Sequence, residues 1–142
     1  MTECDFIGQD NKPQIPLSAS FDTYAMMIHA MNVQKGFYDD EAKVMRILEE
    51  AGDDEAMEAT VKAFMMQRVS LIHSELSEGV EAARKNEMDT HLPQYDGLSV
   101  ELADALIRIL DMAGAYSIPI GEIVTAKLIY NADRPHKHGK CC

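Results

Sequence analysis

The sequence has no tryptophan, only three cysteines and few basic residues, and each shortage excludes a class of protein. The cysteines, two of which are the adjacent Cys141 and Cys142, do not make a disulfide framework, so we expect a cytoplasmic protein. Thirteen basic residues against 24 acidic ones give a formal net charge of −11. That balance argues against a nucleic-acid polymer as partner, because a phosphate backbone needs a basic face. A nucleotide is not excluded, since bound divalent cations can invert the local charge.

Long apolar runs and glycine-rich loops are also missing. No apolar stretch reaches the length needed to span a bilayer, and Glu3 and Asp5 stand where a signal peptide would carry basic residues. We therefore expect no membrane partner. No phosphate-binding loop of the P-loop type can be found, so any nucleotide chemistry must use other groups.

The 142 residues suit one domain, and their apolar residues recur at three- and four-residue steps. No segment alternates as a strand does, so the pattern predicts an all-α antiparallel bundle of four to five helices. Ser20 and Ser99 are candidate N-caps, and Pro119 suits a first helical turn. The predicted helices cover about 20–34, 40–52, 53–85, 99–116 and 120–131. An irregular leader (1–18) precedes the helical domain (19–132), and a basic tail (133–142) follows it.

The long predicted helix 53–85 has two stripes. One is an apolar seam made by Val61, Met65, Val69, Ile72, Leu76, Val80 and Ala83. The other begins with Phe64 and Leu71 and continues through Glu75, Glu78 and Ala82, so acids replace apolar residues along an otherwise packed face. Two seams on one long helix suggest that a second subunit covers one of them.

Two acidic doublets, Glu75-Leu-Ser-Glu78 and Glu101-Leu-Ala-Asp104, carry the chemistry. Side chains at i and i+3 share a helix face, so each doublet directs two carboxylates the same way. If the two helices pack antiparallel with these faces opposed, four carboxylates converge and require a cation among them. Oxygen ligands favour a hard ion, so we expect Mg²⁺, with Mn²⁺ as a substitute.

Simpler interpretations compete with a metal site. A single acidic pair on a helix is usually solvated, and Asp104 with Arg108 could form an ordinary i,i+4 ion pair. On the predicted helix 99–116, Leu102, Leu106, Ile109 and Ala113 are expected to be the core stripe. The polar stripe Glu101, Asp104, Arg108 and Asp111 could then simply face water.

A di-iron bundle is a further alternative, but it is disfavoured. Such bundles pair their glutamates with a Glu-x-x-His motif. Neither His73 nor His91 has a glutamate three residues before it.

Four basic residues and one amide gather near the C-terminus of this acidic chain: Lys127, Arg134, Lys137 and Lys140, with Asn131. Arginine and lysine bind phosphate oxygens, so this segment is a candidate phosphate site, although a solvated charged tail is the alternative. Asn32, Phe37 and Tyr38 could line a base pocket, with core packing and turn formation as their default roles.

Taken in order, Glu75-x-x-Glu78, Glu101-x-x-Asp104 and a tail that runs from Lys127 through Tyr130-Asn131 and Arg134-Pro135 to His138-Gly139 resemble the all-α NTP pyrophosphohydrolases of the MazG type. The resemblance covers roughly residues 21–140, and it implies a homodimer or homotetramer. It implies Mg²⁺-dependent hydrolysis of a nucleoside triphosphate, such as a dNTP or a non-standard nucleotide, to the monophosphate and pyrophosphate in nucleotide-pool housecleaning.

The resemblance also implies roles for individual residues. Glu75, Glu78, Glu101 and Asp104 would be the metal ligands, and Glu75 or Glu78 would act on water. Lys127, Asn131 and Arg134 would hold phosphates, and Asn32 would approach the base or sugar. Many members of the family carry an additional acid immediately before the first glutamate, where this chain has Ser74. A non-catalytic helical protein that binds a nucleotide or a partner is therefore the alternative function.

Overall fold

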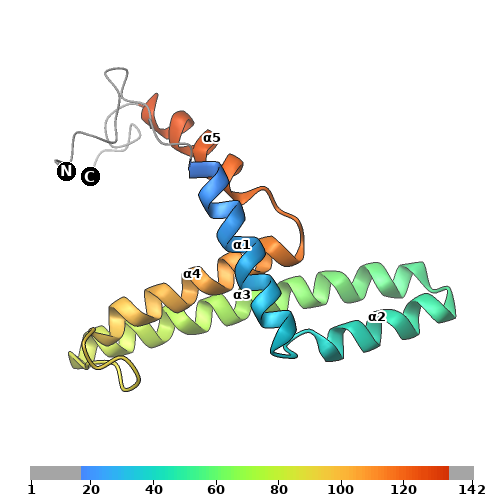
Figure 1. The fold of residues 1–142 in the computed structure, drawn as a ribbon, viewed down its shortest axis with the longest axis horizontal. Coiled ribbons are helices and arrows are strands. Elements are labelled where there is room, and N and C mark those ends of the chain that lie inside the picture. The colour runs from blue at the N-terminus through green and yellow to red at the C-terminus, as the bar shows by residue number, and fades with distance from the viewer. Residues whose placement is uncertain (1–16, 135–142) are drawn as a thin grey trace.

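The computed structural model describes residues 17–134, with the side chains from residue 20 onward, and these residues form five helices (Figure 1). The helices are α1 (Leu17–Gln34), α2 (Asp39–Ala51), α3 (Asp54–Lys85), α4 (Gly97–Ala115) and α5 (Ile120–Ala132). Within this range the chain forms no strand, and its one extended pairing is an isolated bridge between Met88 and Asp96. The predicted all-α fold is confirmed. None of the described helices is long and apolar enough to cross a membrane.

Two of the predicted helix starts are wrong. α4 is capped by Asp96 instead of Ser99, because the Asp96 carboxylate accepts from the Ser99 backbone N–H at 2.9 Å and from its hydroxyl at 2.7 Å. α1 begins at Leu17, so Ser20 lies inside the helix and does not cap it. Asp53 does cap α3, accepting from the Ala56 N–H at 3.0 Å.

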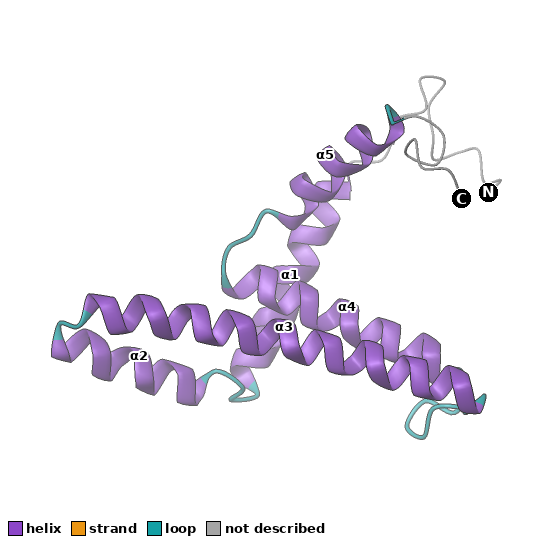
Figure 2. Cartoon of the chain, turned by 180° about the vertical axis from the view of Figure 1, so that it is seen from behind, coloured by secondary structure: helices purple, strands orange, loops and turns teal. Residues whose placement is uncertain are grey.

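The helices are arranged along α3, which forms the long axis of the molecule. α4 packs antiparallel to the C-terminal half of α3, and α2 folds back along its N-terminal half (Figures 1 and 2). α1 crosses near the middle of α3 and packs on α4, and α5 lies against α1. The five helices therefore form an open arrangement in which α1 and α5 project away from the α2–α3–α4 layer.

The core is small and lies where α1 meets α4. Ala25, Leu110 and Ala113 are buried there, and partly buried apolar side chains of Phe21, Ile28, Ile118 and Ile120 pack around them. Gly114 allows this contact, because a Cβ at that position would lie 2.5 Å from the Ala25 carbonyl oxygen and 2.7 Å from the His29 Cβ. The absence of a side chain at Gly114 thus sets how closely the two helices approach.

Of the predicted core stripe of α4, only Ala113 is confirmed as a core residue, at 3% exposure. Leu102 and Leu106 are 53% and 45% exposed and Ile109 is exposed too, whereas Asp111 on the polar stripe is only 9% exposed. On α3, Val80 of the predicted apolar seam is likewise exposed. The polar stripe of α4 turns toward α3, and Leu102, Leu106 and Ile109 turn outward, where the rest of the described chain leaves them exposed.

Replacing Gly114 with alanine is expected to destabilise the protein by about 1–3 kcal/mol, because the new methyl group overlaps α1 backbone. Urea unfolding followed by circular dichroism measures the change. Gly79→Ala is the comparison and should cost less, because the atoms nearest to its Cβ would be the Glu101 and Leu98 side chains at 3.2 and 3.3 Å, and not backbone. Equal stability of the two variants would contradict this account of the α1–α4 contact.

Candidate metal and nucleotide site

The packing of α3 against α4 brings acidic side chains from both helices together. Glu75, Glu78 and Glu101 each offer a carboxylate oxygen, and these three atoms lie within 4.8 Å of one another. Glu75 is 7% exposed, so it is among the most buried charged residues of the described chain, and Glu78 is exposed. The convergence predicted from the two doublets is therefore present for three of the four acids.

Small residues make this convergence possible. Gly79 is buried against α4, and a Cβ there would lie 3.2 Å from the Glu101 Cβ. At the start of α4, a Cβ on Gly97 would lie 2.8 Å from the Ala82 Cβ. Because neither glycine carries a side chain, the helices approach closely over the segment that holds the doublets.

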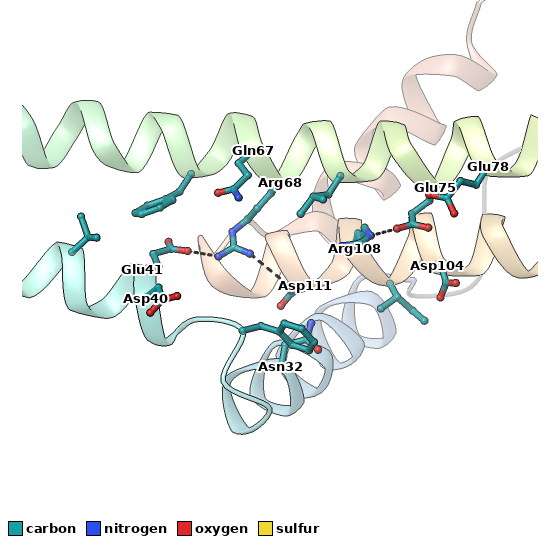
Figure 3. A pocket seen from close by; sticks show the side chains of 15 residues that line it. Asn32, Asp40, Glu41, Gln67, Arg68, Glu75, Glu78, Asp104, Arg108 and Asp111 are labelled. Atoms are coloured by element: carbon teal, nitrogen blue, oxygen red, sulfur yellow. Dashed lines mark hydrogen bonds and ion pairs between the residues drawn. The ribbon is translucent and has the colours of Figure 1, made fainter. Parts of the chain in front are cut away.

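Asp104, the fourth acid, lies outside the three-residue group but belongs to the same electrostatic cluster. It lines a cavity with Glu75 and Glu78, and all three lie at one end of that cavity (Figure 3). Partial burial, followed by the negative charge of Glu75, raises the pKa of the Asp104 carboxyl. Partial burial together with a hydrogen bond to Glu75 and the charge of Glu78 raises the pKa of Glu101. Ionising all of these carboxyls is therefore unfavourable, and a bound cation would reduce the free-energy cost of doing so.

Arg108 is the cation that the described residues place against these acids. Its Nε donates a hydrogen bond to Glu75 Oε1 across the helix pair. The alternative in which Arg108 pairs with Asp104 on its own helix does not hold, because Arg108 pairs with Glu75 on α3 instead. An i,i+4 pair of the ordinary exposed kind is made on α3 by Lys85 and Glu81, at 3.2 Å.

Ser74, which stands where many proteins of the resembled family carry an acid, contacts the cluster. Its hydroxyl donates to Glu78 Oε1 at 3.1 Å. The hydroxyl therefore orients Glu78 but adds no negative charge.

A second polar group lies at the other end of the cavity, where α1, α2, α3 and α4 meet. Arg68 donates to Glu41 and lies 3.9 Å from an Asp111 carboxylate oxygen, and Asp111 is also 3.2 Å from His29 Nδ1. The Arg68 guanidinium stacks over the Tyr38 ring at 4.1 Å. Burial next to Asp111 raises the pKa of the Tyr38 hydroxyl. This network was not predicted; the burial of Asp111 could not be read from its place on a polar stripe.

The cavity between the two groups has a volume of about 820 Å³, within the range of small-molecule sites. Figure 3 shows both arginines directed into the space between α3 and the other helices. The predicted base-contact residue Asn32 lines this cavity. So does Phe37, whereas Tyr38 belongs to the network around Arg68. The lining residues are Asn32, Phe37, Asp40, Glu41, Val44, Phe64, Gln67, Arg68, Leu71, Glu75, Glu78, Asp104, Ile107, Arg108 and Asp111.

The structure does not bring the predicted phosphate-binding residues to this cavity. Lys127, Asn131 and Arg134 belong to α5 or follow it, and none of them lines the cavity. Lys127 and Arg134 instead lie 4.8 and 5.9 Å from the Tyr130 ring. Lys137 and Lys140 lie outside the described residues. Among the described residues of one chain, the cations that line the cavity with the carboxylates are Arg108 and Arg68.

Comparisons of the chain with protein-family models, with curated proteins and with solved structures found no match.

The acid cluster predicts a specific pH dependence of stability. Folding raises the pKa values of Glu101 and Asp104, so the native protein holds protons that the unfolded chain releases just above the ordinary values of 4.5 and 3.8. Without metal, this contribution to stability falls as pH rises through that window. Between pH 4 and 7, the melting temperature of the wild type should therefore include a decrease with rising pH that the Glu101→Gln/Asp104→Asn double variant lacks.

Glu81 contributes to stability with the opposite pH dependence, and its contribution changes in a lower pH range than that of Glu101 and Asp104. Hydrogen bonds from Arg84 and Lys85 lower the pKa of Glu81 to about 2, so its stabilisation is lost only as pH falls below 4.5. Identical pH profiles for the wild type and the double variant would contradict repulsion within the cluster.

Proposed function

We propose that this chain hydrolyses a nucleoside triphosphate to the monophosphate and pyrophosphate, with Mg²⁺ held by Glu75, Glu78, Glu101 and Asp104. The observation that carries the proposal is the group of three carboxylate oxygens within 4.8 Å, at one end of a cavity that also contains two arginines. Acids that gather metal beside cations that bind anions are the arrangement that phosphoryl chemistry requires. The sequence resemblance supports the same reaction.

The donor set fits a hard divalent cation. All four ligand groups are carboxylates, and oxygen ligands favour Mg²⁺ or Mn²⁺ over zinc or copper. Burial, and after it the neighbouring carboxylates, raises the pKa values of Glu101 and Asp104, and a bound cation would favour their charged forms. When bound, Mg²⁺ would neutralise the triphosphate oxygens and lower the pKa of water.

The residues of the chain have separable roles in this proposal. Glu78 is exposed, and Ser74 fixes one of its oxygens, so we assign Glu78 to positioning or deprotonating the attacking water. Glu75 is buried and holds its position through Arg108. The rest of the cavity, including Asn32, would accommodate the sugar and base.

The proposed enzyme is a homo-oligomer. Exposed apolar side chains run along α3 and α4, among them Val80, Leu102 and Leu106, and packing against a second chain would remove them from water. A second chain is also the route by which Lys127, Asn131 and Arg134 could reach a phosphate, since α5 lies away from the cavity of its own chain. A sedimentation mass of two or four chains is expected.

A non-catalytic nucleotide-binding protein is the second candidate. Two observations favour it: Ser74 provides no extra carboxylate, and Arg108 already balances Glu75 without a metal. Such a protein would bind Mg²⁺ and nucleotide but release no pyrophosphate.

The proposal is tested by measuring pyrophosphate release from a panel of NTPs and dNTPs, with Mg²⁺ and with EDTA. We expect selective, EDTA-sensitive release of pyrophosphate and no release of phosphate. Glu78→Gln should lower kcat at least about 100-fold, as expected for loss of a general base, while the helical circular dichroism stays unchanged. Glu58→Gln is the matched control, because Glu58 pairs with Lys62 on the same helix, away from the cavity.

Full activity of Glu78→Gln would contradict the assignment of this residue. If the folded wild type released no pyrophosphate from any nucleotide of the panel but was stabilised against heat by a nucleotide, the non-catalytic candidate would be favoured.

A further inference from the structure

We propose that Arg108 is an exchangeable cation: it holds Glu75 while the site has no metal, and it moves to a substrate phosphate when a divalent ion binds. This inference rests on the proposed function and adds a residue that the sequence resemblance does not assign. Arg108 would thereby couple the binding of the metal to the binding of the triphosphate.

The ion pair between Arg108 and Glu75 occupies a ligand that the metal needs. Glu75 is the most buried member of the cluster, and Arg108 donates to one of its two carboxylate oxygens. Among the ion pairs of the described residues, this is the only one made by any of the four proposed ligands. Replacing Arg108 with an ion is therefore the main local change that loading the site requires.

Arg108 is free to move, whereas Arg68 is not. The Arg108 side chain is 42% exposed and forms one ion pair. The Arg68 side chain is 15% exposed, pairs with Glu41 and Asp111, and lies between the Tyr38 and Tyr116 rings at 4.1 and 5.9 Å. Arg68 is thus a fixed charge in the cavity wall, while Arg108 can change its partner by side-chain rotation.

Electrostatics determines where Arg108 goes. A divalent cation at Glu75 repels the guanidinium and competes for the same oxygen. The acids one turn away on α4 are poor new partners, because Asp104 is itself a proposed metal ligand and Asp111 already contacts His29 and Arg68. Phosphate oxygens in the cavity that Arg108 lines are the remaining anions, and a guanidinium can bind them with two hydrogen bonds.

This exchange predicts opposite effects on the two ligands. With Arg108 on Glu75, part of the metal-binding energy is spent on breaking the ion pair, so the apparent affinity for Mg²⁺ alone is reduced. Removing Arg108 should strengthen the binding of Mg²⁺ alone and weaken the binding of a triphosphate. A variant that merely damages the fold would weaken both.

The experiment measures both affinities by isothermal titration calorimetry on wild type, Arg108→Gln and Arg108→Lys. The first titrant is Mg²⁺ without nucleotide, and the second is an α,β-methylene dNTP, a non-hydrolysable analogue, in saturating Mg²⁺. We expect Arg108→Gln to bind Mg²⁺ about tenfold more tightly and the analogue about tenfold more weakly. Arg108→Lys keeps the charge and should lie between the two. Arg84→Gln is the control, since Arg84 pairs with Glu81 on the exposed face of α3 and should match wild type.

Each outcome separates this inference from the proposed function. Unchanged Mg²⁺ affinity in Arg108→Gln would overturn the exchange while leaving the metal site and the reaction intact. Tighter Mg²⁺ with undiminished analogue binding would overturn the phosphate-binding half. Absence of Mg²⁺ binding by the wild type itself would instead overturn the proposed function.

Discussion

The close approach of α3 to α4 is the constraint on which the site depends. Gly79 and Gly97 lack the side chains that would hold the helices apart, and the consequence is that acidic residues from both helices converge. Burying negative charges together is unfavourable, and the structure responds with one arginine and with carboxyls whose pKa values are raised. In the proposed function, a cation completes this cluster of acids.

The cavity is organised by charge from end to end. Its acidic end holds Glu75, Glu78 and Asp104, and its other end holds the fixed Arg68 network, with Arg108 between them (Figure 3). Asp40, Glu41 and Asp111 also line the Arg68 end, so an elongated anion would find complementary groups along this axis only with a metal bound to it. The same arrangement explains why an acidic chain can be suited to a phosphorylated ligand: the local charge pattern, and not the net charge of −11, decides what binds.

Much of the fold followed from the sequence, because helical periodicity and acidic spacing are local properties. All five helices lie close to the predicted ranges, and the i,i+3 rule correctly placed Glu75 and Glu78 on one face. The orientation of α4 could not be predicted, since both its stripes repeat at helical spacing and only contacts with α1 and α3 select between them. Long-range pairs such as Arg108 with Glu75 and Arg68 with Glu41 leave no local signal at all. The position of α5, remote from the cavity, could likewise not be predicted from the order of the motifs along the chain.

The central claim is that the four carboxylates of α3 and α4 hold a divalent cation. The most direct test is an anomalous difference map from crystals of the protein soaked in Mn²⁺, recorded near the manganese absorption edge. The account predicts a peak among the carboxylates of Glu75, Glu78, Glu101 and Asp104, with the Arg108 guanidinium no longer on Glu75. A map without a peak there, and with the Arg108–Glu75 ion pair intact at saturating Mn²⁺, would contradict it.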